Sequence, residues 1–196
     1  RRLSIIDLSE GGHQPMTTES LVITFNGEIY NYREIKKELV ALGHQFRSES
    51  DTEVILHAYL EWGEDMIKRL NGMFAFSLLD HAHNKMIVVR DRAGIKPLYY
   101  YKDDRILMFA SELKPFYEHH NFPKVINVEA AKLFFQYGYI PAPHSIFEGA
   151  FKLNPGHYLR IDLKDRSHKF YSTRIVRTSK DVLGTKRVNF ISKLHI

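Results

Sequence analysis

Asn26 and Gly27 follow the apolar run 21–25 and place two hydrogen-bond donors side by side. A side-chain amide and a backbone N–H that point into one cleft can stabilise an oxyanion, as they do in acyl transfer. A plainer interpretation is a tight turn that only reverses the chain after a strand, because Asn-Gly pairs tolerate positive φ. The two residues by themselves leave both interpretations open.

Arg2 and Asp51 carry opposite charges that suit the two ends of an amino acid. Arg2 directly precedes the stretch 3–6, a predicted buried strand, where a fixed guanidinium could hold a carboxylate through two hydrogen bonds. Asp51 lies at the predicted start of a helix, where a carboxylate can receive an ammonium group. Together they would suit a zwitterion, although Arg2 also fits a surface position and Asp51 also fits a plain helix cap.

Several kinds of site are disfavoured by the residue types present. No Gly-x-x-x-x-Gly-Lys-Ser/Thr or Ser-Gly-Gly-x-Asp-Ser segment occurs, so nucleotide binding is unsupported. The sequence contains no cysteine, which rules out disulfides, thiolate metal sites and a cysteine nucleophile within the chain as given. The 11 histidines are scattered, so no metal site is predicted.

The net charge of +5 comes from one end of the chain. Residues 164–196 carry nine Lys or Arg and two acidic residues, whereas residues 1–163 have a net charge of −2. We therefore predict no nucleic-acid partner. No apolar run approaches the roughly 20 residues of a membrane-spanning helix, and no secretory signal pattern opens the chain. These features predict a soluble, cytoplasmic protein with no membrane contact.

Apolar periodicity predicts the helices and strands that must position these side chains. Nearly continuous apolar runs at 73–79 and 86–89 predict a central hairpin whose strands are buried on both faces. Ser50 or Asp51 is the predicted cap of one helix. The other predicted elements are strand 21–25, helices near 35–42, 51–62, 65–70 and 127–137, a hairpin of 98–101 with 106–110, and strand 157–162. Because helices and strands arrive in blocks, an α+β fold is predicted, with mainly antiparallel sheet and layers on both sides.

Five segments, in this order, resemble the N-terminal glutaminase domain of glutamine-dependent asparagine synthetases. These segments are 2–7, 12–16, 26–32, the Ser-Asp-Thr-Glu at 50–53, and 90–98. The resemblance runs from residue 1 to about residue 162. Such domains are class II glutamine amidotransferases of the N-terminal-nucleophile hydrolase superfamily. The resemblance implies an αββα sandwich of two mainly antiparallel sheets, and hydrolysis of glutamine to glutamate and ammonia.

The resemblance also implies which residues touch the substrate. These residues are Arg2, Leu3, Ser4, Ile5, Asn26, Gly27, Glu28 and Asp51. Arg2 would hold the glutamine carboxylate, and residues 3–5 would line the same wall. Asn26 with Gly27 would form the oxyanion hole, and the two acidic residues would hold the substrate amino group. Segment 90–98 would support the fold and a contact with a synthetase domain, although a charged turn between strands explains it equally well.

The family's nucleophile is a cysteine at the mature N-terminus, which this sequence does not contain. Residue 1 lies inside a family motif, so we expect a domain at 1–163 with its start missing. A basic tail at 164–196 would follow, with no synthetase domain. The resemblance implies that the ammonia feeds a synthetase domain that uses ATP and Mg to amidate aspartate, and no metal or cofactor is expected in this chain. A homodimer is one candidate assembly. The alternative function is a non-catalytic glutamine-binding or regulatory module.

Overall fold

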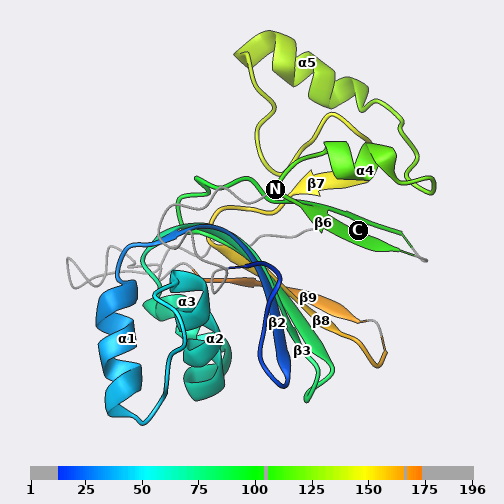
Figure 1. The fold of residues 1–196 in the computed structure, drawn as a ribbon. Coiled ribbons are helices and arrows are strands. Elements are labelled where there is room, and N and C mark those ends of the chain that lie inside the picture. The colour runs from blue at the N-terminus through cyan, green and yellow to red at the C-terminus, as the bar shows by residue number, and fades with distance from the viewer. Residues whose placement is uncertain (1–12, 104–105, 166, 174–196) are drawn as a thin grey trace, which may run out of the picture.

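Two antiparallel β-sheets form the centre of the molecule (Figure 1). The computed structural model describes residues 13–103, 106–165 and 167–173. In the larger sheet the strand order is β1-β2-β3-β4-β8-β9. These strands are β1 (Met16–Thr17), β2 (Leu21–Ile29), β3 (Gly72–Asp80), β4 (Lys85–Arg90), β8 (His157–Asp162) and β9 (His168–Ser172). The smaller sheet has the order β6-β5-β7, with β5 (Tyr99–Lys102), β6 (Leu107–Ala110) and β7 (Ala150–Lys152).

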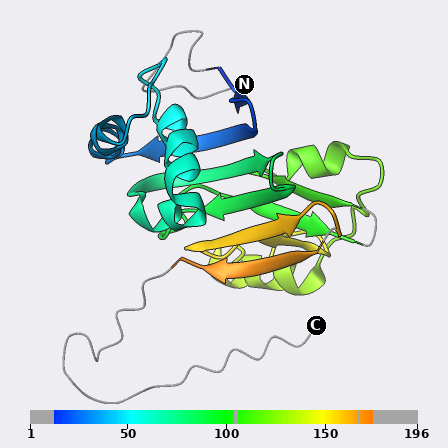
Figure 2. The same cartoon turned by 90° about the horizontal axis from the view of Figure 1, so that it is seen from below.

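Helices lie outside both sheets, as Figures 1 and 2 show. One face of the larger sheet is covered by α1 (Tyr32–Ala41), α2 (Asp51–Trp62), the 3-10 turn η2 (Gly63–Asp65) and α3 (Met66–Arg69). On the outer side of the smaller sheet lie α4 (Lys114–Glu118) and, farther out, α5 (Val128–Tyr137). A cluster that includes Phe116 of α4 packs against the smaller sheet. The predicted four-layer α+β sandwich is therefore confirmed.

Alternation along β3 explains why its sequence is apolar on both faces. Phe74, Phe76 and Leu78 pack with the residues of α1, α2 and α3. Ala75 points the other way and packs with Val88 in the core between the two sheets. Since successive strand residues face opposite sides, a strand between two cores needs apolar residues at nearly every position. The predicted central hairpin is confirmed as β3 and β4.

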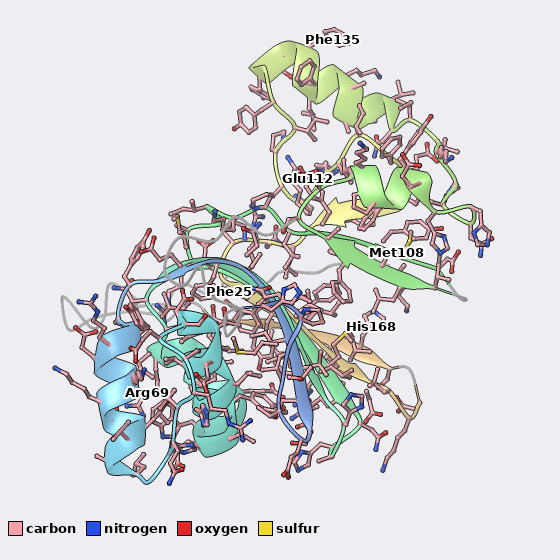
Figure 3. All side chains as sticks on the ribbon, in the orientation of Figure 1. Phe25, Arg69, Met108, Glu112, Phe135 and His168 are labelled. Carbon is pink, nitrogen blue, oxygen red and sulfur yellow. The ribbon has the colours of Figure 1, made fainter. Side chains whose placement is uncertain are left out.

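The predicted helix at 127–137 is present as α5, which has little contact with the core. It begins after Asn127, whose side chain accepts the Ala130 N–H at 3.0 Å. Ala130 is its one buried residue, and Phe135 is 86% exposed. Figure 3 shows Phe135 pointing away from the rest of the molecule. Within the described part of the chain, no helix is long and apolar enough to cross a membrane.

The tight turn, the plainer of the two interpretations of Asn26 and Gly27, is wrong. Strand β2 continues through both residues to Ile29, and Gly27 lies opposite Phe74 of β3. A Cβ atom on Gly27 would lie 2.1 Å from the Met73 carbonyl oxygen. Glycine is required here because the β3 backbone approaches too closely for any side chain, and its φ is 155°. Only the neighbouring strand, which is distant in the sequence, reveals this requirement.

The larger sheet continues beyond residue 163, where the domain was expected to end. Strand β9 pairs with β8, and the next residue, Thr173, is buried. Both the backbone N–H and the hydroxyl of Thr173 donate to the Gly156 carbonyl, at 2.7 and 2.9 Å. Sequence patterns missed β9 because a polar edge strand has no apolar periodicity. They also missed β1, β7 and α4, which have at most five residues each.

Segment 90–98 is more than a charged turn, because it is organised around one buried carboxylate. Asp91 is completely buried, and its carboxylate accepts four backbone N–H groups. The donors are Phe74 at 3.3 Å, Ala93 at 3.0 Å, Ile95 at 3.0 Å and Lys96 at 2.9 Å. The Asp91 N–H in turn donates to the Phe74 carbonyl at 2.8 Å. Asp91 therefore fixes β3 at the residue that lies opposite Gly27.

Candidate functional site

The edge of β2 that faces away from β3 is only partly covered. Strand β1 pairs with Val22 and Ile23, and beyond them no described strand continues along this edge. The Phe25 N–H donates instead to the side chain of Gln14, with 2.7 Å to Oε1. The Ile29 N–H donates to Oδ2 of Asp51 at 3.0 Å. Side chains therefore replace a neighbouring strand at these two positions.

The Gly27 N–H lies between these two occupied positions. N–H groups two residues apart in an antiparallel strand point to the same edge, so the Gly27 N–H points the same way as those of Phe25 and Ile29. Among the residues that the structure describes, no acceptor is assigned to it. Its backbone is held by the close approach to β3. The result is a fixed donor of the kind that stabilises an oxyanion.

The Asn26 side chain points from the face of β2 that is turned toward the smaller sheet, into a cleft between the two sheets. Its Nδ2 donates to the hydroxyl of Ser111 at 3.2 Å. The cleft has a volume of about 180 Å³. It is lined by residues of both sheets, such as Ser77 and Phe109, and by Gln14, which precedes β1. Asn26 and Gly27 thus offer donors from neighbouring positions of one strand.

Asp51 is buried beside the same edge of β2. Its residue is 4% exposed, and it lies in the first turn of α2. The hydroxyl of Ser50 accepts the Thr52 N–H at 3.2 Å and caps the helix. Of the two residues predicted as possible caps, Ser50 is therefore the cap and Asp51 is not. The Asp51 carboxylate instead meets β2 at Ile29, two residues from Gly27. At ~3.4 Å per residue this separation is ~7 Å, comparable with an extended glutamine.

The remaining predicted site residues lie elsewhere or outside the described chain. Glu28 lines a separate cleft of about 500 Å³, together with Tyr30 and Arg33. Arg2, Leu3, Ser4 and Ile5 lie outside the described residues. The structure therefore brings the Gly27 N–H and Asp51 to one edge of β2, and places the Asn26 side chain in the cleft between the sheets and the Glu28 side chain in a third location, a neighbouring cleft.

Gln14 and Ser111 contact this site, but the sequence patterns assign neither of them a role. Gln14 belongs to the segment 12–16 that carried part of the family resemblance, so its region had a signal. Ser111 had none, because it is 85 residues away from Asn26 along the chain. Only the packing of the two sheets brings it to the site.

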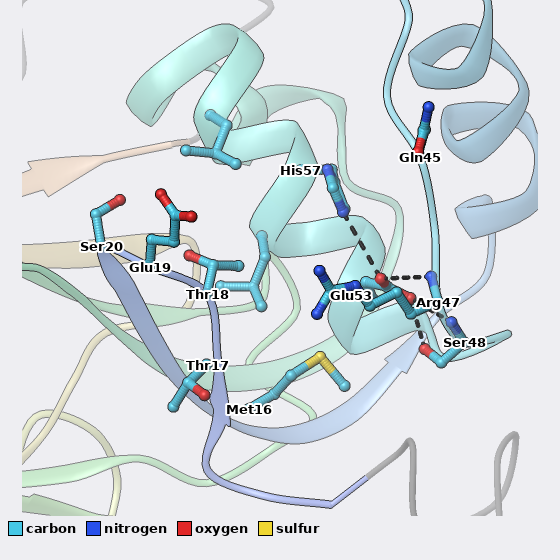
Figure 4. Close-up of a pocket in the computed structure, with 12 residues that line it drawn as sticks. Met16, Thr17, Thr18, Glu19, Ser20, Gln45, Arg47, Ser48, Glu53 and His57 are labelled. Atoms are coloured by element: carbon cyan, nitrogen blue, oxygen red, sulfur yellow. Dashed lines mark hydrogen bonds and ion pairs between the residues drawn. The ribbon is translucent and has the colours of Figure 1, made fainter.

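A larger cleft, of about 590 Å³, lies between segment 16–20 and α2 (Figure 4). Glu53 lines it, and its carboxylate accepts the backbone N–H groups of Arg47 and Ser48 at 2.8 and 2.7 Å. The Ser48 hydroxyl donates to it as well, at 2.7 Å. Burial raises the pKa of Glu53, but these hydrogen bonds outweigh burial and leave the pKa below its usual value. Of the predicted site residues that the structure describes, none lines this cleft, and we interpret Glu53 as a structural group.

Acid is expected to weaken the domain through Glu53. Because its folded pKa lies below the unfolded value, ionised Glu53 stabilises the fold above about pH 4.3, and this contribution is lost as the pH falls through the folded pKa. Glu53→Gln should cost about 1–3 kcal/mol at pH 7 and less at pH 3, as measured by urea unfolding. The control is Glu49→Gln, because the Glu49 side chain is 83% exposed. An equal cost of Glu53→Gln at both pH values would contradict the assignment.

No cluster of three or more potential metal-ligating side chains is present in the described ranges. The site is instead made of amide, hydroxyl and carboxylate groups around one strand edge. Such groups can bind an ammonium group and stabilise a developing negative charge.

Comparison with known protein families shows to which family this chain belongs. The glutamine amidotransferase domain family matches residues 1–172. This chain belongs to that family. The match includes β9, in agreement with the sheet that continues beyond residue 163.

Curated relatives of this amidotransferase domain are named as asparagine synthetases. Glutamine-hydrolysing asparagine synthetase 3 of Bacillus subtilis is 40% identical over 164 residues, which are 81% of this chain and 26% of that protein. A putative asparagine synthetase 2 of Methanocaldococcus jannaschii is 39% identical over 188 residues, which are 87% of this chain and 36% of that protein. The chain thus spans about a quarter to a third of the length of these relatives.

Solved structures show the same fold for this amidotransferase domain. A glutamine phosphoribosylpyrophosphate amidotransferase from B. subtilis, complexed with ADP and GMP, superposes with a TM-score of 0.58 and 24% identity. The superposition covers 86% of this chain and 33% of that chain. A structure of the allosteric regulatory enzyme of purine biosynthesis gives a TM-score of 0.56 at 24% identity, and covers 84% of this chain and 32% of that chain. At this identity the likeness concerns the fold alone.

Proposed function

We propose that this chain is the glutamine-hydrolysing domain of an asparagine synthetase-like amidotransferase. The observation that carries the proposal is the Gly27 N–H, a fixed donor that lies between Asn26 and the buried carboxylate of Asp51. Hydrolysis of an amide develops negative charge on the carbonyl oxygen, which fixed N–H donors stabilise. The substrate is L-glutamine, and the products are L-glutamate and ammonia.

Each site residue has a separate role in this proposal. The Gly27 N–H and the Nδ2 of Asn26 stabilise the oxyanion. Asp51 receives the substrate ammonium group, and for Glu28, whose side chain lines the neighbouring cleft, the same role rests on the family resemblance. Arg2 binds the substrate carboxylate through two hydrogen bonds, with residues 3–5 along the same wall. The nucleophile is not among these residues, since the sequence holds no cysteine, and we assign it to the cysteine that family members carry at the mature N-terminus.

Ammonia released at this site would be used by a second domain. The named relatives, which are much longer than this chain, support a synthetase domain that uses ATP and Mg to convert aspartate to asparagine. The residues of this chain would bind neither ATP nor the metal ion. We place the reaction in the cytoplasm, where glutamine, aspartate and ATP occur together. The names of these relatives favour hydrolysis over a non-catalytic glutamine-binding or regulatory module.

Glutamine binding by the full chain tests the proposal directly. Asp51→Asn should weaken L-glutamine binding at least 30-fold in isothermal titration calorimetry, because a buried charge partner of the ammonium group is removed. The fold should persist, since the asparagine oxygen can still accept the Ile29 N–H. The matched control is Asp65→Asn, because the Asp65 side chain is 76% exposed. Unchanged affinity in Asp51→Asn, or no binding by the wild type, would refute the assignment.

Hydrolysis is tested on the protein isolated from its natural source. Release of one glutamate for each glutamine consumed is expected. Tight glutamine binding without any glutamate release would instead support the non-catalytic module.

A further inference from the structure

We propose that Ser111 is a positioning residue that holds the Asn26 carboxamide in the orientation that oxyanion stabilisation needs. The inference rests on the proposed function and deepens it. Asn26 is on β2 of the larger sheet, whereas Ser111 directly follows β6 of the smaller sheet. The 3.2 Å contact between Nδ2 of Asn26 and Oγ of Ser111 therefore crosses from one sheet to the other.

The chemistry of a carboxamide explains why it needs such a contact. Nδ2 carries two N–H groups, and the side chain can rotate about its last bond. Ser111 accepts one of these N–H groups, which leaves the second available to a ligand. Without an acceptor at this position, the carboxamide would sample several orientations. A donor that must be ordered during the reaction stabilises the oxyanion less than one that is already fixed.

The surroundings of the contact hold both partners in place. Ser111 follows Ala110, whose position is set by its pairing with Tyr99 of β5. Leu98 and Phe109 line the same cleft, and the hydrogen bond itself is partly buried. A hydrogen bond in such partly apolar surroundings is stronger than one in water. The packing of the two sheets thus determines where the Asn26 amide points.

Two ligands separate positioning from simple binding. The γ-carboxylate of L-glutamate places a negative charge where the oxyanion would develop, so its affinity depends on the oxyanion donors. L-glutamine has a neutral amide there, and its affinity depends mainly on the groups that hold its ammonium and carboxylate. Loss of the Ser111 contact should therefore weaken the binding of L-glutamate more than the binding of L-glutamine.

The experiment measures both dissociation constants by calorimetry on the full chain. Ser111→Ala should weaken L-glutamate binding about tenfold and L-glutamine binding less than threefold, since a hydrogen bond to a charged group is worth more than a neutral one. Ser111→Thr keeps the hydroxyl and should restore both affinities. The matched control is Ser77→Ala, because Ser77 lines the same cleft but pairs with Thr24 at 2.7 Å.

A second readout reports on Asn26 without any ligand. In 15N–1H spectra, the side-chain amide signals of Asn26 should shift and exchange faster with water in Ser111→Ala, and should remain unchanged in Ser77→Ala. Equal losses of affinity for both ligands, or an unchanged Asn26 signal, would overturn the inference. If the wild type binds glutamine, equal losses of affinity or an unchanged Asn26 signal overturn only the role of Ser111 and leave the proposed function intact. Absence of binding of both ligands by the wild type overturns the proposed function, and the Asn26 signal still decides whether Ser111 orients the amide.

Discussion

Gly27→Ala is expected to destabilise the domain by about 3–5 kcal/mol, as measured by urea unfolding followed by circular dichroism. The new Cβ would lie 2.1 Å from the Met73 carbonyl oxygen and 2.7 Å from the Phe74 Cα. Both atoms belong to the β3 backbone, so no side-chain rotation can relieve the contact. Strand β2 would have to move away from β3 at the position of the candidate oxyanion donor. The glutamine site should be lost together with the stability.

The matched control for this substitution is Gly43→Ala. Gly43 has a φ of 99°, and a Cβ atom there would meet nothing within 4 Å. This variant should cost only the backbone strain, about 1 kcal/mol, because no atom collides with the new methyl group. Equal unfolding midpoints for the two variants would show that the close approach of β3 has no energetic importance.

Asp91→Ala is expected to cost about 3–5 kcal/mol, a large part of the stability of about 5–15 kcal/mol of an ordinary domain. The substitution leaves four backbone N–H groups around a buried position without their acceptor. Each unsatisfied buried N–H carries its own desolvation cost. One of the four belongs to Phe74, so the damage should extend to the strand opposite Gly27. Thermal unfolding of the purified variant measures the loss.

Two further variants identify the cause of that loss. Asp91→Asn keeps one accepting oxygen and should cost clearly less than Asp91→Ala. Asp162→Ala removes an exposed carboxylate that accepts one N–H, from Lys164 at 2.8 Å, and should change stability by less than 1 kcal/mol. If Asp91→Ala behaves like Asp162→Ala, segment 90–98 does not support the fold in the way described.

Elements with a local periodic signal were predictable from the sequence. Strands β3 and β4 and helix α2 follow from apolar spacing and from the Ser50 cap, because these signals lie within one element. Strand β9 was missed, since its stability comes from pairing with β8 and not from its own pattern. Local patterns report on elements that bury an apolar face, and they do not report on polar edge strands.

The sequence by itself determined the family, the α+β layers and the residue types of the site. Motifs such as 26–32 and 50–53 are contiguous, so they can be read without knowing where the chain goes next. Only the tertiary structure decided that Gly27 lies in a strand, that Asp51 binds the Ile29 N–H, and that Ser111 contacts Asn26. These contacts join residues 22 to 85 positions apart, and their energies arise from the packing of two sheets and a helix. Residue spacing along the chain carries no record of such contacts, which is why the geometry of the site had to be seen.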